Sequence, residues 1–308
     1  MNPLPIKQKR FLKEGTIYFL IAIPFMIYIF MFVYMTVFGL SYAFVDFRPA
    51  FGWQPWNHEF RGLHMFRQIW AERTEMLRVL YNTLSLSFIS LALSPLPVIL
   101  AIFFMEVRNK LTKKICQTIS TFPHFISFVI VYGIAFTFFS NTGVIANLRL
   151  SLGMERQTMS IIANPNYAWL MYIVISSWKS IGWSAIIYCA AISGIDETLY
   201  EAAKVDGASK LRQIIHITIP GVKETFIVLF LLATSGILGS NFDYIFLFQN
   251  QLTVQRLMTL QFYIYRMGIV RGQISYSVAV SILTTIIGLT LLFTMNRVAK
   301  AVRGDSII

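Results

Sequence analysis

Six long apolar runs constrain the fold of this chain more than any other feature. They cover residues 16–45, 80–105, 115–139, 167–192, 222–248 and 276–296. Each run holds about 20 or more mostly apolar positions, enough to cross a hydrocarbon core of roughly 30 Å as an α-helix. The alternating pattern of about 10 residues that a membrane β-strand needs does not occur in them. The sequence therefore predicts an all-α integral membrane protein with six transmembrane helices.

The overall composition supports a membrane protein. Hydrophobic residues make up 56% of the chain and charged residues only 13%, whereas soluble domains carry about 25% charged residues. The first apolar run is longer than the core of about 7–15 residues in a cleavable signal, so we expect it to remain as a membrane helix. The net charge of +12 is explained by membrane topology, and we expect no nucleic-acid partner.

Lysine positions predict the orientation in the membrane. Every lysine except Lys179 lies before the first run, after the second, around the loop between the fourth and fifth, or after the sixth. These residues are Lys7, Lys9, Lys13, Lys110, Lys113, Lys114, Lys204, Lys210, Lys223 and Lys300. Because cytoplasmic segments carry the excess of basic residues, both termini of this multi-pass membrane protein are expected on the cytoplasmic side.

The polar loop at residues 193–220 has an internal pattern of its own. We expect a short helix from Asp196 to Asp206, with Asp196 capping its N-terminus. Gly207 then supplies the freedom for a sharp turn, and a second short helix follows over Ser209–Ile217. Pro220 is expected at the opening of the fifth span, where its missing N–H costs little.

The spacing in this loop resembles the cytoplasmic coupling loop of ATP-binding-cassette importer permeases. Six positions match at fixed spacing: Glu201-Ala202-Ala203, Gly207 and the pair Ile217 and Pro220. The resemblance implies a type I importer permease fold and a docking site for a separate ATPase subunit. The residues expected to make that site are Glu201, Ala202, Ala203, Asp206, Gly207, Ile217 and Pro220.

The resemblance also implies a domain division. Residues 1–79 would hold the N-terminal tail, the first span and an outer segment, 80–297 the permease core, and 298–308 a cytoplasmic tail. The segments Asp243–Gln251, Tyr263–Gly268, Gly272–Ala279 and Asn296-Arg297 are similar to the carbohydrate-uptake branch. Within that branch they most resemble permeases for polysaccharide-derived and complex oligosaccharides.

Polar and aromatic residues in the spans are candidates for a substrate path. Tyr172, Ser176, Lys179 and Trp183 recur at spacings of three and four, which places them on one helical face. A lysine at mid-membrane is costly unless it faces water or a partner. Aromatic rings stack on sugars, and packing aromatics remain the alternative for Tyr172 and Trp183. The full candidate set is Tyr172, Ser176, Lys179, Trp183, Asn241, Asp243 and Tyr244.

No catalytic or cofactor pattern accompanies these spans. A phosphate-binding G-x-x-x-x-G-K-[ST] loop does not occur, and His58, His64, His124 and His216 lack metal-ligand spacing,. We therefore expect no catalytic residue, no metal and no bound cofactor, with ATP and Mg²⁺ held by the partner ATPase. The resemblance implies further partners: a second permease in a heterodimer, two ATPase copies, an extracytoplasmic solute-binding protein, and membrane lipid.

Three alternative functions remain, and a membrane-embedded enzyme among them is disfavoured because no nucleophile–base or metal constellation appears in the spans. The same machinery could import another solute, such as a glycerophospho compound or a peptide. A secondary transporter would need no coupling loop, and an inverted repeat is not apparent. Arginines outnumber acidic residues on the expected outer side, which suits either docking of an acidic binding protein or, together with Lys179, a carboxylated saccharide.

Overall fold

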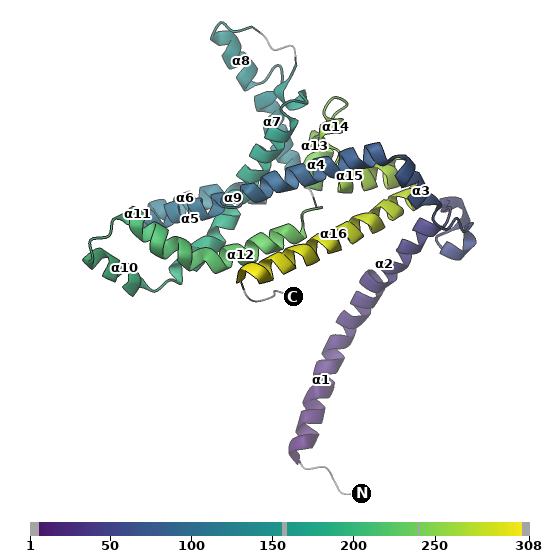
Figure 1. Ribbon diagram of the computed structural model, residues 1–308, viewed down its shortest axis with the longest axis horizontal. Helices are drawn as coiled ribbons and strands as arrows, with labels where there is room; N and C mark the ends of the chain where they lie inside the picture. Colours follow the sequence, from purple (N-terminus) through teal and green to yellow (C-terminus); the bar gives the residue numbers. More distant parts are fainter. Residues whose placement is uncertain (1–5, 156–158, 240, 304–308) are drawn as a thin grey trace. The chain divides into compact units, whose positions relative to one another are not determined.

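The computed structural model describes residues 6–155, 159–239 and 241–303, and it is built almost wholly from helices (Figure 1). Among these residues, six helices are long and apolar enough to cross a membrane. They cover Gly15–Phe44, Arg73–Glu106, Phe128–Ser151, Ala168–Ser193, Lys210–Thr234 and Ile274–Thr294. The all-α membrane fold predicted from the apolar runs is confirmed.

The chain divides into two compact units, each described here by itself. The first holds residues 1–72 and 264–283, and the second holds residues 73–263 and 284–308. The predicted boundaries at 79 and 297 stay predictions. Helix α16 continues to Arg303, and residues 304–308 of the expected tail lie outside the described residues.

The first unit carries the N-terminal span and a small outer lobe. Its helices are α1 (Ile6–Ile29), a π-helical turn (Phe30–Tyr34), α2 (Met35–Val37), 3₁₀ turns (Phe38–Phe44, Pro49–Phe51, Pro55–Asn57), α3 (His64–Ala71), a π-helical turn (Arg266–Val270) and the start of α16 (Ile274–Arg303).

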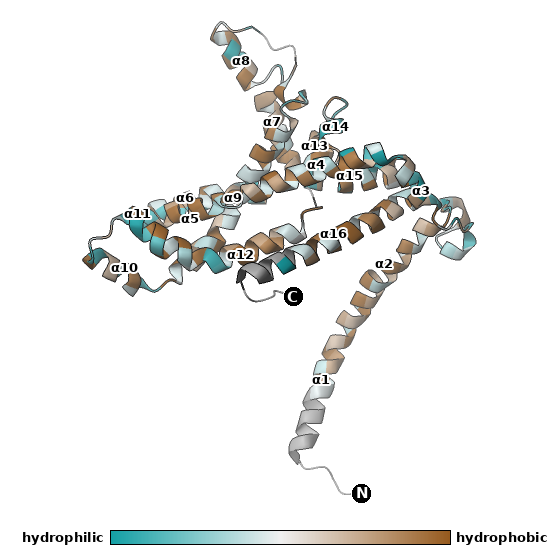
Figure 2. Ribbon diagram, viewed as in Figure 1, coloured by the Kyte–Doolittle hydropathy of each residue, from teal (hydrophilic) through white to brown (hydrophobic). Residues whose placement is uncertain are grey.

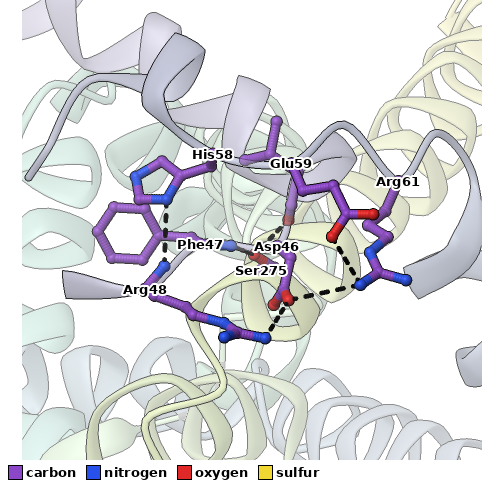
Figure 3. A network of polar contacts seen from close by, with 8 residues as sticks. Asp46, Phe47, Arg48, His58, Glu59, Arg61 and Ser275 are labelled. Atoms are coloured by element: carbon purple, nitrogen blue, oxygen red, sulfur yellow. Dashed lines mark hydrogen bonds and ion pairs between the residues drawn. The ribbon is translucent and has the colours of Figure 1, made fainter. Parts of the chain in front are cut away.

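Ser275, in the first turn of α16, fixes the extended segment of the lobe (Figure 3). Its hydroxyl donates to the carbonyl of Val45 at 2.7 Å and accepts from the amide of Phe47 at 2.9 Å. Arg48 and Arg61 pair with Asp46 on the exposed side, where such ion pairs contribute only about 0–1 kcal/mol. The backbone bridge through the buried Ser275 therefore does more to order this lobe than its surface charges do.

The second unit holds the permease core. Its helices are α4 (Arg73–Ala92), α5 (Leu96–Glu106), α6 (Lys110–Phe125), α7 (Phe128–Phe139), α8 (Val144–Ser151), a 3₁₀ turn (Ile161–Ala163), α9 (Ala168–Ser193), α10 (Glu197–Val205), α11 (Lys210–Gln213), a π-helical turn (Ile214–Thr218), α12 (Ile219–Ser235), α13 (Phe242–Phe248), α14 (Val254–Leu257), α15 (Leu260–Tyr265) and the end of α16.

Helix α9 is the centre of this unit, in contact with α4, α5, α6, α12 and α14 (Figure 1). An apolar core joins α5, α9 and α12 through residues that include Phe104, Tyr188, Ile192 and Val222. Hydrophilic residues gather instead at α11, as the teal ribbon in Figure 2 shows, and α10 alternates between hydrophilic and hydrophobic residues. The bundle thus has an apolar body with a polar loop projecting from it.

Three expected spans are interrupted: a turn at residues 93–95 separates α4 from α5 within the run 80–105, and two further interruptions correct predicted bounds. The run 115–139 is split at Ile126 and Ser127, whose extended backbone separates α6 from α7. The run 222–248 ends as a helix at Ser235, and α13 is separate. Ser127 starts a new helix because its hydroxyl caps the amide of Ile130 at 3.4 Å,, and glycines after α12 disfavour its continuation.

Helices α6 and α9 approach each other closely at Gly182. A Cβ atom at Gly182 would collide with the carbonyl oxygen of Ser120. Only glycine leaves room for this backbone contact, as in other membrane helix pairs with small residues at the interface.

Replacing Gly182 with alanine is expected to destabilise the core. The clash cannot be relieved by a side-chain rotation, so we expect a loss of about 1–3 kcal/mol, seen as a lower midpoint in thermal unfolding of the purified protein. Gly133→Ala on α7 is the matched control, because nothing lies within 4 Å of the added methyl. Equal midpoints for the two variants would show that α6 and α9 do not meet at Gly182.

Candidate functional site

A cavity runs along α9 between α4 and α12. Two adjoining volumes of about 490 and 340 Å³ share Ser90, Ser94, Ser176, Ser180 and Ala233 as lining residues. Other lining residues include Ser87, Ser177, Ser184, Tyr172 and Asn241. No charged side chain belongs to this lining in the described part of the chain. The cavity therefore offers hydroxyl, phenol and amide groups between apolar walls.

Three of the predicted path residues meet at this cavity. Tyr172 is buried, and its phenol oxygen accepts from the backbone amide of Asn241 at 3.4 Å. The hydroxyl of Ser176 is shielded and has no hydrogen-bond partner among the described residues, and the same holds for Ser94. Because buried polar groups normally have partners, these two hydroxyls mark the part of the cavity best suited to a polar ligand.

Lys179 and Trp183 contact α6 instead, so the four residues predicted on one face of α9 do not all line the cavity. The ammonium group of Lys179 lies at the end of α6, within hydrogen-bond distance of three carbonyl oxygens. Trp183 stacks on His124 with ring centroids 4.8 Å apart and planes 6° apart. Both side chains therefore face α6. The four predicted residues span enough of the circumference of α9 for two of them to meet the cavity and two to meet α6.

The two remaining candidates on α13 also differ from each other. Asp243 is exposed in the first turn, where a carboxylate suits the positive end of a helix,. Tyr244 is almost fully buried, stacked on Phe248 at 4.1 Å and edge-on to Tyr172 at 5.0 Å. Tyr244 thus packs behind the cavity wall, and its part in a substrate path stays a prediction.

The sequence argument named Ser176 but missed the other serines that line the cavity. Ser87 and Ser90 lie on α4 and Ser94 lies in the turn that follows it, at spacings of three and four, and Ser176, Ser180 and Ser184 recur at spacings of four on α9. This is helical spacing within apolar spans. The pattern was available in the sequence, but only the packing of α4 against α9 shows that the two sets face one cavity.

The coupling loop begins with the predicted helix α10. The side chain of Asp196 accepts from the amide of Thr198 at 2.9 Å, and this bond holds the pKa of the carboxyl below its usual value. The cap is therefore present while Asp196 is ionised and is lost as the pH falls through that lowered pKa. Val205 is 88% exposed and Leu199 52% exposed, beside the exposed Ala202. This apolar side is uncovered.

Gly207 ends α10 as predicted, with φ at 73°. The amide of Gly207 donates to Lys204 at 3.1 Å and that of Ala208 to Ala203 at 2.8 Å, the paired bonds of a Schellman motif. A left-handed residue is needed here, and the space around Gly207 is otherwise open. Asp206 is the C-cap residue of α10 and directly precedes this turn.

The predicted second short helix does not stand alone. Ser209 caps α11, which continues through the π-helical turn Ile214–Thr218 directly into α12. Pro220 therefore lies inside a continuous helix rather than at its opening, which corrects the prediction. The wide turn just before Pro220 relieves the clash between its ring and the preceding turn. Ile217 is partly buried within this turn.

Two polar contacts tie the coupling loop to the membrane helices. The hydroxyls of Tyr200 and Thr218 are 2.9 Å apart, and the ammonium of Lys210 is 3.0 Å from a carboxylate oxygen of Glu106 at the end of α5. A polar pocket of about 380 Å³ beside them is lined by Glu106, Glu201, Lys204 and others. Glu201 is exposed at its rim. Tyr200 therefore joins α10 to the π-helical turn that leads into α12, and Lys210 joins α11 to α5.

Comparisons with known proteins agree with this geometry. Residues 93–304 match the family described as the inner membrane component of binding-protein-dependent transport systems. The chain belongs to that family. Two relatives and a solved structure extend the similarity over nearly all of the chain.

Both relatives are from Bacillus subtilis (strain 168). Protein LplB is 36% identical over 291 residues, covering 94% of this chain and 90% of LplB. The polygalacturonan/rhamnogalacturonan transport system permease protein YteP is 37% identical over 284 residues, covering 92% and 87%. A solved structure is also similar: a bacterial ABC transporter involved in the import of the acidic polysaccharide alginate, in complex with a periplasmic protein that carries an alginate pentasaccharide. One of its chains is 30% identical to this chain, with a TM-score of 0.86. The match covers 97% of this chain and 99% of that chain.

Family membership confirms the type I importer permease fold expected from the coupling loop. The protein is a multi-pass membrane transport component rather than a catalytic one. Among the described residues, no group of three histidine, cysteine or acidic side chains could hold a metal ion. The candidate site consists of an uncharged cavity beside α9 and an exposed loop around α10.

Distortion of the Gly207 turn is expected to uncouple ATP hydrolysis from the arrival of loaded binding protein. Gly207→Pro forces φ to about −65°, against 73° in the structure, and Glu201→Lys reverses the charge at the pocket rim. Both should leave membrane insertion intact and lower ATPase stimulation by loaded binding protein at least about tenfold.

The control for Gly207 is a glycine with the same backbone. Gly153 has φ at 75° and open space around it, so Gly153→Ala and Gly207→Ala carry a similar strain of about 1–2 kcal/mol. Only Gly207→Ala should reduce the stimulated ATPase rate. Equal rates would remove the docking role of this turn.

Proposed function

We propose that this chain is a permease subunit of an ATP-driven, binding-protein-dependent importer for oligosaccharides or polysaccharide fragments, uronate-containing ones among them. It would act in a bacterial cytoplasmic membrane. The observation that carries the proposal is a hydroxyl-lined membrane cavity in the same unit as an exposed coupling helix. The saccharides named for YteP and for the alginate transporter support the substrate class.

Saccharides suit the chemistry of this cavity. Their hydroxyl groups would exchange hydrogen bonds with the exposed lining serines Ser90 and Ser180, and the unpaired, shielded oxygens of Ser94 and Ser176 would gain partners if the wall opened around a sugar. Apolar walls between the serines fit the apolar faces of sugar rings. Tyr172, Ser176 and Asn241 would line the path directly, whereas Lys179, Trp183, Asp243 and Tyr244 would contribute from its surroundings.

The importer would require several other subunits. A second permease in a heterodimer would close the open side of the cavity, and two ATPase copies would bind ATP and Mg²⁺, for which this chain carries no motif. The uncovered apolar side of α10, with Val205 and Leu199 exposed, supports docking of one ATPase there. An extracytoplasmic binding protein would deliver the saccharide, and lipid would surround the remaining helices.

Coupling would follow from the ties between loop and helices. Closure of the ATPase dimer on ATP would move α10, and the contacts of Tyr200 with Thr218 and of Glu106 with Lys210 would pass that movement to α12 and α5. The permease pair would then alternate between two arrangements, each biased by a different ligand. This chain would contribute no catalytic residue to ATP hydrolysis.

Reconstitution tests the proposed machine. The chain expressed with its neighbouring transport genes should be recovered with a different membrane subunit and an ATPase in stoichiometric amount. Proteoliposomes of that complex with loaded binding protein should take up a defined oligosaccharide, such as trigalacturonate or galactotriose, and should hydrolyse ATP faster when it is present. An active homodimer would contradict the heterodimer, and uptake of a peptide alone would contradict the substrate class.

The serine lining gives a sharper test of the path. Ser176→Leu should block the cavity and reduce saccharide uptake at least about tenfold, since about 3 Å of added side chain cannot leave a tightly packed wall unchanged. Leu170→Ser, on the exposed side of the same helix, is the control for altered polarity. Full uptake by Ser176→Leu would remove this cavity from the path.

A further inference from the structure

The break between α6 and α7 leaves backbone carbonyls at the end of α6, against Lys179 in the middle of the candidate membrane span Ala168–Ser193. Ile126 has φ −76° and ψ 132°, so the helical run of hydrogen bonds stops there. A carbonyl without a partner costs several kcal/mol in hydrocarbon, and non-helical backbone is tolerated there only where the protein satisfies it.

Lys179, on α9, donates hydrogen bonds to these carbonyls. Its ammonium nitrogen lies 3.2 Å from the carbonyl oxygen of Pro123, 2.7 Å from that of His124 and 2.5 Å from that of Ile126. An ammonium group has three donors, so these carbonyls can use all of them. The negative end of the α6 dipole favours a cation at the same place.

The same lysine also contacts the first residue of α7. Its nitrogen lies 5.1 Å from the ring centre of Phe128, within the range of a cation–π interaction. Phe128 in turn meets the buried ring of Tyr244 edge-on at 6.3 Å. Tyr244 contacts Tyr172 at 5.0 Å, and Tyr172 lines the cavity.

We propose that Lys179 is a positioning residue that holds the break between α6 and α7 and, through Phe128 and Tyr244, sets the cavity wall at Tyr172. This rests on the cavity being the path in the proposed function. Lys179 does not read the charge of the substrate, because its three protons are engaged by backbone carbonyls. The contact lies on the α6 side of α9, and the lining residues of the cavity in the described chain carry no charge.

Three substitutions separate positioning from charge recognition. Lys179→Met removes every donor, Lys179→Arg keeps the charge and the donors, and Lys179→Gln keeps two N–H donors without the charge. Trp178→Phe, at an exposed neighbouring position on α9, is the control. Each is made in the assembled transporter with its partner permease, ATPase and binding protein.

Uptake of a charged and a neutral saccharide of equal length is the first measurement. Lys179→Met should lower the maximal rate for trigalacturonate and for galactotriose by the same factor, about tenfold or more, because charge-assisted hydrogen bonds are strong. Lys179→Gln should recover part of both rates and Lys179→Arg most of them. A selective loss of trigalacturonate uptake in both Met and Gln variants would overturn the proposal.

Labelling of the break is the second measurement and needs no transport. Cysteine at position 126, with Cys116→Ser and Cys189→Ala to remove the native thiols, should react with N-ethylmaleimide several-fold faster in Lys179→Met, since loosening admits water and thiolate is the reactive form. Unchanged labelling in a folded Lys179→Met complex would overturn the proposal.

The two measurements fail independently. If the wild-type complex transports neither saccharide, the proposed substrate class fails while labelling still tests the break. If Lys179→Met does not assemble, labelling and uptake of Lys179→Gln against Lys179→Arg carry the test: partial recovery by the neutral donor supports positioning, and total loss in that folded variant contradicts it.

Discussion

The need to satisfy backbone polar groups inside hydrocarbon shapes this protein more than any single side-chain contact. A continuous helix meets that need by itself, and the features that matter most are the places where a helix is interrupted. At the α6–α7 break, Lys179 donates to the free carbonyls. After the end of α12, the amide of Asn241 donates to Tyr172. Before Pro220, a π-helical turn makes room for the proline ring. The end of α12 lies at the cavity and Pro220 lies in the coupling loop, whereas the α6–α7 break contacts the cavity wall through Phe128, Tyr244 and Tyr172.

Helix α9 connects these features because it meets most of the core. One side packs tightly against α6 at Gly182, another contributes serines to the cavity, and its cytoplasmic end leads through Asp196 into α10. At Gly182 the backbones of α9 and α6 leave no room for even a methyl group, whereas another side of α9 borders the cavity.

Much of this could be predicted from the sequence, because the relevant signals are local. Apolar runs give the membrane helices, Asp196 and Gly207 give both ends of α10, and the spacing from Glu201 to Pro220 gives the family. The breaks at Ile126 and after Ser235 were not predicted, since hydropathy averages over the few residues that interrupt a helix. The role of Lys179 was also beyond reach, because its carbonyl partners lie more than fifty residues away in the chain.

The position of Lys179 changes how substrate charge can be understood. A lone lysine in a membrane helix suggests a site for an anionic saccharide, yet here backbone carbonyls occupy its donors and the cavity lining offers hydroxyls. Serine hydroxyls accept and donate, so they can bind sugar hydroxyls regardless of the carboxylates present. If acidic saccharides pass through, their charge must be recognised by another surface, such as the binding protein or the second permease. The cavity in this chain would then distinguish sugars by shape and hydroxyl pattern rather than by charge.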